Sequence, residues 1–285
     1  MPVDSLKLRT RTLDLGSPVV MGILNVTPDS FSDGGTFVDP ARAVGRAQAM
    51  AEEGAALIDV GGESTRPGAA PVTAAEELDR VLPVIEALVA HGAPPVSVDT
   101  TKPEVMRAGA AAGAELINDV RALREAGALE TAAESGCAVC LMHMQGEPRT
   151  MQQAPHYDDV VEEVYAFLAQ RIEACVAAGI SPERIAIDPG FGFGKTLEHN
   201  LALMRSLPRF TALGVPVLVG ISRKSMIGGI TGRPVEERLA GGLALTALAI
   251  AAGVSIMRSH DVAATLDAVR VAAAVTRVTG RTGQV

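Results

Sequence analysis

The sequence predicts an α/β fold, a closed (β/α)8 TIM barrel of eight parallel strands with helices between them. Eight short apolar runs rich in Val, Ile and Leu alternate with longer amphipathic segments along the chain. The length of 285 residues is close to the roughly 250 residues that are common for such barrels. We therefore expect a single domain over residues 1–285, with an open, doubly wound sheet as the alternative.

The expected strands are short and apolar. They begin at Val19, Ala56, Pro95, Glu115, Ala138, Arg184, Val215 and Ser255. The expected helices include residues 40–54, 74–92 and 160–179, and the last two end at glycine, a common helix stop. Residues 6–16 show the period-two alternation of a β-hairpin, which we expect to cap the bottom of the barrel.

Residues 239–257 carry no charge and are long enough to suggest a membrane helix. However, the stretch is rich in Ala, contains three glycines and ends in the β-like residues VSIM. We therefore interpret it as a buried helix, a turn and a strand, and expect no membrane association. The first ten residues include Asp4 and no apolar run, which is unlike a signal peptide.

The charge and cysteine content restrict the possible partners and compartment. The formal net charge of −8 argues against non-specific binding to nucleic acid or to an acidic membrane surface. The odd count of three cysteines indicates a reducing compartment, so we expect a cytoplasmic protein. Cys137 and Cys140 have the CxxC spacing, but residues three apart on a strand face opposite sides. We expect buried, inert thiols.

Polar residues stand at nearly every expected strand end. Because the active sites of barrels lie at the carboxyl ends of the strands, these residues predict one polar mouth above an apolar barrel. Its members are Asn25, residues 61–68, Asp99, Asn118 with Asp119, Met142 with His143, Asp188, residues 222–225, and Arg258 with His260.

This mouth has two chemical halves. Asp99, Asn118 and Asp188 are acceptor-rich and suit a ligand edge with N–H donors, such as an aminopyrimidine. The cationic half suggests a phosphate or pyrophosphate in an otherwise acidic protein, and consists of Arg66, Lys224, Arg258 and His260. Asn25 and the aspartates of the following loop are suited to Mg2+, which prefers oxygen ligands and substrate phosphates.

Taken in order, the strand ends resemble the dihydropteroate synthase family. The matching segments span nearly the whole chain and are residues 25–35, 59–69, 99–103, 117–119, 141–146, 187–195, 220–225 and 258–261. Two small departures from the family pattern are Thr101 and Ser259, and neither removes a group with an expected chemical role. The resemblance implies an enzyme that joins a dihydropterin pyrophosphate to p-aminobenzoate, a homodimer, and a sulfonamide target.

The same resemblance implies a role for each site residue, with Asp99, Lys224 and Arg258 as the catalytic residues. The residues expected to bind the pterin or its pyrophosphate are Thr65, Arg66, Asp99, Asn118, Met142, Asp188, Phe193, Lys224, Arg258, Ser259 and His260. Those expected at p-aminobenzoate are Phe31, Thr65, Pro67 and Ser222, where Ser222 would begin a helix whose free N–H groups receive the carboxylate. Asn25 is the expected ligand of Mg2+, the expected cofactor.

Several residues also have simpler interpretations. Asp59 is expected to hold neighbouring backbone inside the barrel rather than to act in catalysis, and His143 to be a buried core histidine. Residues 190–196 fail the phosphate-loop pattern because Pro189 stands where glycine is required. Their glycines are expected to allow close approach of a flat ligand, and Lys195 to be solvated.

Two rival functions and one hypothesis about motion stay open from the sequence. A pterin-binding methyltetrahydrofolate methyltransferase would share the acceptor residues but has no need of residues 61–68 or 222–225. A silent paralogue would bind pterin without turnover. The loop over residues 27–36 is rich in Gly and Ser and is a candidate lid. The charge-free helix at residues 239–252 is a plausible dimer contact.

Overall fold

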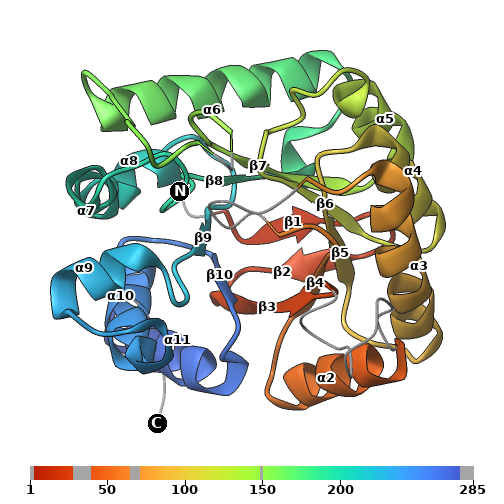
Figure 1. Ribbon diagram of the computed structural model, residues 1–285, viewed down its shortest axis with the longest axis horizontal. Helices are drawn as coiled ribbons and strands as arrows, with labels where there is room; N and C mark the ends of the chain where they lie inside the picture. The colour runs from red at the N-terminus through yellow and green to blue at the C-terminus, as the bar shows by residue number, and fades with distance from the viewer. Residues whose placement is uncertain (1–2, 28–39, 65–70, 148–149, 277–285) are drawn as a thin grey trace, which may run out of the picture.

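The computed structural model describes residues 3–27, 40–64, 71–147 and 150–276, and it contains one sheet of eight parallel strands. In the order in which neighbouring strands are hydrogen-bonded, the sheet runs β8 (Ile185–Asp188), β7 (Ala138–Met142), β6 (Leu116–Asp119), β5 (Val96–Asp99), β4 (Leu57–Gly61), β3 (Val19–Asn25), β10 (Ile256–Ser259) and β9 (Leu218–Gly220). The two edge strands meet through a parallel bridge between Ile187 and Val217, where the N–H of Ile187 donates to the carbonyl of Pro216 at 3.0 Å. The sheet therefore closes on itself, and the predicted barrel is confirmed (Figure 1).

Each expected strand is present, with slightly narrower bounds. The barrel strands are buried on both faces, which is why the sequence shows them as continuous apolar runs rather than alternating ones.

The helices lie around the outside of these strands (Figure 1). The α-helices are α2 (Pro40–Glu52), α3 (Ala74–Ala90), α4 (Pro103–Ala111), α5 (Ala128–Ser135), α6 (Val160–Ala177), α7 (Leu197–Arg205), α8 (Leu207–Thr211), α9 (Ser225–Thr231), α10 (Leu239–Ala251) and α11 (Val262–Thr276). Two short 3-10 helices occur at Pro182–Arg184 and Val235–Glu237. Thr73 and Glu76 form a capping box that starts α3 after an extended segment.

The predicted hairpin closes the bottom of the barrel. Strands β1 (Ser5–Lys7) and β2 (Thr12–Asp14) pair antiparallel. Leu6 and Leu8 are fully buried and pack against the inward-facing residues at the lower end of the barrel strands, which include Met21 and Ile256. Glu115 accepts hydrogen bonds from the N–H and the hydroxyl of Thr10, which fixes the hairpin to the strands.

The uncharged stretch forms the expected helix, turn and strand, but its helix is only half buried. Leu248 of α10 is 59% exposed, and Leu239, the first residue of the helix, is 44% exposed. None of the described helices combines the length and the apolar character needed to cross a membrane. The expectation of a buried helix is therefore wrong for its outer face.

The three cysteines are buried and unpaired. Cys137 packs in the layer between the strands and the helices, whereas Cys140 packs inside the barrel. Burial raises the pKa of both thiols, which keeps them protonated and unreactive. This placement matches the expectation that the two cysteines face opposite sides of one strand.

Candidate active site

Arg258 is the centre of the polar mouth. It lies near the end of β10 and reaches across the barrel, where its Nε donates to Oδ2 of Asp59 at 2.6 Å and its Nη2 donates to Oδ2 of Asp99 at 2.7 Å. The register of the parallel strands sets Asp99 beside Asn118 and beside Gly61. The carboxyl ends of β4, β5, β6 and β10 therefore converge on one guanidinium.

Asp59 holds two of these site residues in place. Its side chain is fully buried, and its Oδ2 accepts from both Arg258 and the Nδ2 of Asn118, the latter at 3.0 Å. Because its Nδ2 donates to Asp59, the side-chain amide of Asn118 has a fixed orientation at the end of β6. The partners of Asp59 are thus two side chains of the site, rather than the neighbouring backbone that the sequence suggested.

Burial perturbs the charged groups of the site. Burial and the nearby charge of Asp59 raise the pKa of Asp99 to about 7, although Arg258 opposes this shift. Burial also raises the pKa of Asp188 to about 6, against the N–H of Gly190 and the positive charge of Lys224. For Lys224, burial lowers the pKa to about 8, while Asp188 acts in the opposite direction. Such shifts near neutral pH are typical of functional sites.

One wall of the site is apolar and can hold a flat ring. Phe193 lies in the loop after β8, and the Nζ of Lys224 lies 4.0 Å from the centroid of its ring. Met142, at the end of β7, packs with Met144 and with Phe193 in a small separate apolar cluster. The structure thus brings Met142, Phe193 and Lys224 to the same side of the mouth as Asp188.

Ser222 and His260 lie together on another side of the mouth. The Oγ of Ser222 is 3.0 Å from the Nδ1 of His260. Helix α9 begins at Ser225, so the expectation that Ser222 starts the helix is wrong by three residues. The hydroxyl of Ser259 is buried against Thr265 of α11, at 2.8 Å from its hydroxyl, and is not brought together with Arg258.

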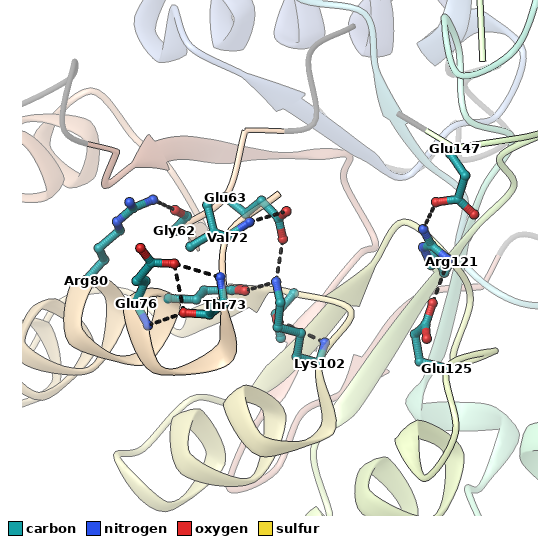
Figure 2. Close-up of polar contacts among 12 residues, drawn as sticks. Gly62, Glu63, Val72, Thr73, Glu76, Arg80, Lys102, Arg121, Glu125 and Glu147 are labelled. Atoms are coloured by element: carbon teal, nitrogen blue, oxygen red, sulfur yellow. Dashed lines mark hydrogen bonds and ion pairs between the residues drawn. The ribbon is translucent and has the colours of Figure 1, made fainter. Parts of the chain in front are cut away.

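The segment after β4 is fixed at both of its described ends (Figure 2). The Oε1 of Glu63 accepts from the N–H of Val72 at 3.2 Å. The Nζ of Lys102 bridges Glu63 and the fully buried Glu77, at 2.5 Å from each carboxylate. Thr65, Arg66 and Pro67 belong to the part of this segment that lies outside the described residues. Phe31 and most of the candidate lid, earlier in the chain, also lie outside them.

Lys195 is the main difference from expectation. It is 3% exposed rather than solvated, and its Nζ contacts the carbonyls of Gly190 and Phe193 at 2.9 and 3.0 Å. Sequence reasoning missed it because a lysine before a helix start is usually exposed, and no local pattern reports that three carbonyls surround it. His143 is buried as expected, with its Nδ1 3.0 Å from the same ammonium.

The fold and the site define a pterin-binding barrel enzyme, and comparisons with known proteins agree. Residues 21–260 match the family described as "Pterin binding enzyme". Dihydropteroate synthase of Escherichia coli (strain K12) is 55% identical over 260 residues, which cover 91% of this chain and 92% of that protein. The chain therefore belongs to the dihydropteroate synthase family.

Solved structures give the same result. Dihydropteroate synthase of Xanthomonas albilineans, solved with 4-aminobenzoic acid, is 56% identical and has a TM-score of 0.90, covering 96% of this chain and 99% of that one. A structure of dihydropteroate synthase from the same organism, in complex with 7,8-dihydropteroate, is 54% identical with a TM-score of 0.87, at the same coverage.

Proposed function

We propose that the chain condenses 6-hydroxymethyl-7,8-dihydropterin pyrophosphate with p-aminobenzoate to give 7,8-dihydropteroate and pyrophosphate. It is a transferase of the dihydropterinylmethyl group in folate biosynthesis. The observation that carries the proposal is the placement of Arg258 against Asp59 and Asp99 at the barrel mouth. Solved relatives that are more than half identical hold p-aminobenzoate or the product.

The pterin half of the substrate suits the acceptor-rich side of the site. The carboxylates of Asp99 and Asp188 and the amide oxygen of Asn118 can accept hydrogen bonds from the ring N–H groups of an aminopyrimidine. Lys224 would donate a hydrogen bond to the edge of the pterin ring. Phe193 and Met142, which lie on the same side of the mouth, would pack against the faces of that ring. In this arrangement the polar groups set the orientation of the ring and the apolar groups exclude water from it.

The pyrophosphate and the benzoate occupy the outer part of the mouth. Arg66 and Arg258 are proposed to neutralise the charge that grows on the pyrophosphate as its bond to the methylene carbon breaks, and Thr65 and His260 to bind its oxygens. The hydroxyl of Ser259 contacts Thr265 instead and has no part in this proposal. The neutral amine of p-aminobenzoate forms the new bond to that carbon and then releases a proton to solvent. Ser222, Phe31, Thr65 and Pro67 are proposed to hold the benzoate, which is also where sulfonamides would compete.

Magnesium is proposed as the cofactor, with Asn25 as its protein ligand. Asn25 ends β3 beside Gly61, which in turn pairs with Asp99, so Asn25 lies at the same end of the barrel as the site. Within the described parts of the chain, no group of three or more His, Cys, Asp and Glu residues could hold a metal. Mg2+ takes few protein ligands and completes its coordination with substrate phosphates and water, and when bound it would neutralise leaving-group charge.

A homodimer in the cytoplasm is proposed for the assembled protein. Helices α10 and α11 pack against each other, and both expose large apolar side chains. Leu248 of α10 and Val271 and Val275 of α11 are 59% to 80% exposed. Exposed apolar side chains on neighbouring helices can mark an interaction site, and a second copy of the chain would bury them. The buried, unpaired cysteines support a reducing compartment.

A turnover assay tests the proposed activity against its rivals. Purified protein is mixed with the dihydropterin pyrophosphate, p-aminobenzoate and Mg2+, and pyrophosphate release is followed with and without the benzoate. Release that requires both the benzoate and Mg2+ is the expected result. Tight pterin binding without release would instead indicate a silent paralogue, and methyl transfer from methyltetrahydrofolate would indicate the methyltransferase.

A further inference from the structure

Lys195 holds two loops of the barrel mouth together. Besides the carbonyls of Gly190 and Phe193, its Nζ is 3.0 Å from the Nδ1 of His143 and 3.3 Å from the carbonyl of the same residue. Burial lowers the pKa of Lys195 to about 7, although the negative charge of Asp188 opposes this shift. In the protonated form, all three N–H donors of the ammonium find acceptors inside the protein. One cation therefore joins the segment after β8 to the end of β7.

His143 acts as an acceptor in this contact. Burial, followed by the positive charge of Lys195, lowers the pKa of His143 to about 2, so its ring is neutral at physiological pH. The neutral ring accepts the N–H of Lys195 at Nδ1 and carries its own proton at Nε2. The ring also stands edge-on to Phe167, at 4.9 Å between centroids, which fixes its plane.

The remaining polar groups of the same segment are also held. Asn200 of α7 is buried, and its Oδ1 accepts from the N–H of Gly192 at 2.7 Å. The hydroxyl of Tyr157 donates to the carbonyl of Gly194 at 2.9 Å. Contacts of this number around one loop restrict its backbone to a single conformation.

The glycines of this segment approach the protein's own backbone. Gly190 has a φ of +72°, and a Cβ there would lie 1.9 Å from the carbonyl oxygen of His143. Gly194 has a φ of +63°, and its Cβ would lie 2.4 Å from the carbonyl oxygen of Gln145. These two glycines permit close packing between loops rather than the close approach of a ligand that the sequence suggested.

We propose that Lys195 is a positioning residue for the pterin site, which rests on the proposed function. Its ammonium holds the carbonyl of Phe193, and the ring of the same residue covers the Nζ of Lys224. Lys195 thereby sets where Phe193 and Lys224 meet the pterin, without touching the substrate itself. The positive charge of Lys195 also favours the ionised form of Asp188. In that form, the carboxylate of Asp188 can accept hydrogen bonds from the N–H groups of the pterin ring.

The first test replaces Lys195 by methionine, which keeps the length of the side chain but removes the N–H donors. The KM for the dihydropterin pyrophosphate should rise by at least about tenfold, the effect of one lost charge-assisted hydrogen bond, while the KM for p-aminobenzoate stays within about twofold. Hydrogen–deuterium exchange over residues 190–195 should become faster without ligand. Lys7→Met, which removes an exposed lysine paired with Glu183 at the opposite end of the barrel, is the matched control.

A second variant keeps the test decisive if methionine impairs folding. Lys195→Ala should recover pterin affinity when ethylammonium is added, but not with tetramethylammonium, which has no N–H donor. Unchanged exchange and an unchanged pterin KM in Lys195→Met, or an equal rise of both KM values, would overturn the proposal. Exchange and pterin binding are measured without p-aminobenzoate, so they report on Lys195 even if the wild-type protein shows no turnover.

Discussion

The guanidinium of Arg258 donates to Asp59 at 2.6 Å and to Asp99 at 2.7 Å, so one cation lies between an inner and an outer carboxylate. The inner carboxylate is fully buried and accepts also from Asn118. The outer one is at the site and has a pKa raised to about 7 by burial and by the charge of Asp59. Catalytic pH dependence should therefore respond to a change at Asp59.

The first prediction concerns Asp59→Asn, which keeps the shape of the side chain but removes its charge. Without that charge the pKa of Asp99 falls, because a nearby negative charge no longer disfavours its ionised form. Asp99 then stays ionised in more acidic solution, and the acidic limb of the profile of kcat/KM for the pterin substrate should move to lower pH. The profiles of both proteins are compared between pH 5 and 9. An acidic limb that stays in place would contradict this electrostatic coupling.

The second prediction is that Asp99→Asn lowers turnover far more than stability. Loss of a charged acceptor facing the pterin should reduce kcat/KM by about 10- to 100-fold, equivalent to ~1.5–3 kcal/mol. Thermal unfolding of the variant should lie within a few degrees of the wild type at neutral pH. Near-full turnover in the variant would exclude a catalytic role for Asp99.

The contribution of Asp99 to the free energy of unfolding should decrease as the pH rises. Because the folded-state pKa of Asp99 lies above its unfolded value, the native state holds this proton more tightly than the unfolded state. Its contribution to stability is present at acidic pH and is lost as the pH rises from about 4 to about 7. The asparagine of Asp99→Asn does not titrate. The unfolding free energy of the wild type should therefore fall relative to that of the variant between about pH 4 and pH 7.

The third prediction separates stability from function at the bottom of the barrel. Leu8 is 1% exposed and packs far from the strand ends that hold the site. Leu8→Ala should destabilise the protein by about 2–5 kcal/mol, through lost apolar burial and the cavity left behind. Both KM values should stay unchanged at temperatures where the variant is folded. Denaturant unfolding and steady-state kinetics on the same preparation provide the two measurements.

Much of the fold could be predicted from the sequence because barrel strands have a simple signature. The strands are largely buried on both faces, so Val, Ile and Leu dominate them, and polar residues other than Asp59 and Ser97 stand at the strand ends. Asp99, Asn118, Asp188 and Arg258 were recognised in this way as one group. Their mutual contacts follow from strand register, which periodicity alone does not contain.

Other features depend on tertiary packing and were not readable. The burial of Lys195 depends on where the carbonyls of distant loops meet, and a single sequence does not record that. The outer face of α10 was expected to be buried because it is apolar, but apolar character does not tell whether the covering surface comes from the same chain. The start of α9 at Ser225 rather than Ser222 reflects a turn that includes Arg223 at φ 61°.

The fourth prediction addresses magnesium. Asn25→Ala removes the proposed protein ligand while leaving the cations of the site in place. The Mg2+ concentration required for half-maximal turnover should increase several-fold, and the pterin KM measured at saturating Mg2+ should change little. Gln153→Ala, which removes an exposed side-chain amide, is the control. Asn200 is left unchanged because its side chain binds the N–H of Gly192. Equal Mg2+ requirements in wild type and Asn25→Ala would remove Asn25 from the proposed metal site.

The fifth prediction concerns the exposed apolar face of α10 and α11. Leu248 is 59% exposed and lies on the outer side of α10, so a charge placed there cannot disturb the barrel core. In a dimer that buries this face, Leu248→Glu would bring a carboxylate into an apolar interface. Burying this unpaired charge would make dimerisation less favourable. Sedimentation at micromolar concentration should show a dimer for the wild type and a monomer for the variant. Val89→Glu, at a comparably exposed apolar site on α3, should remain dimeric, and a monomeric wild type would contradict the assignment of this face.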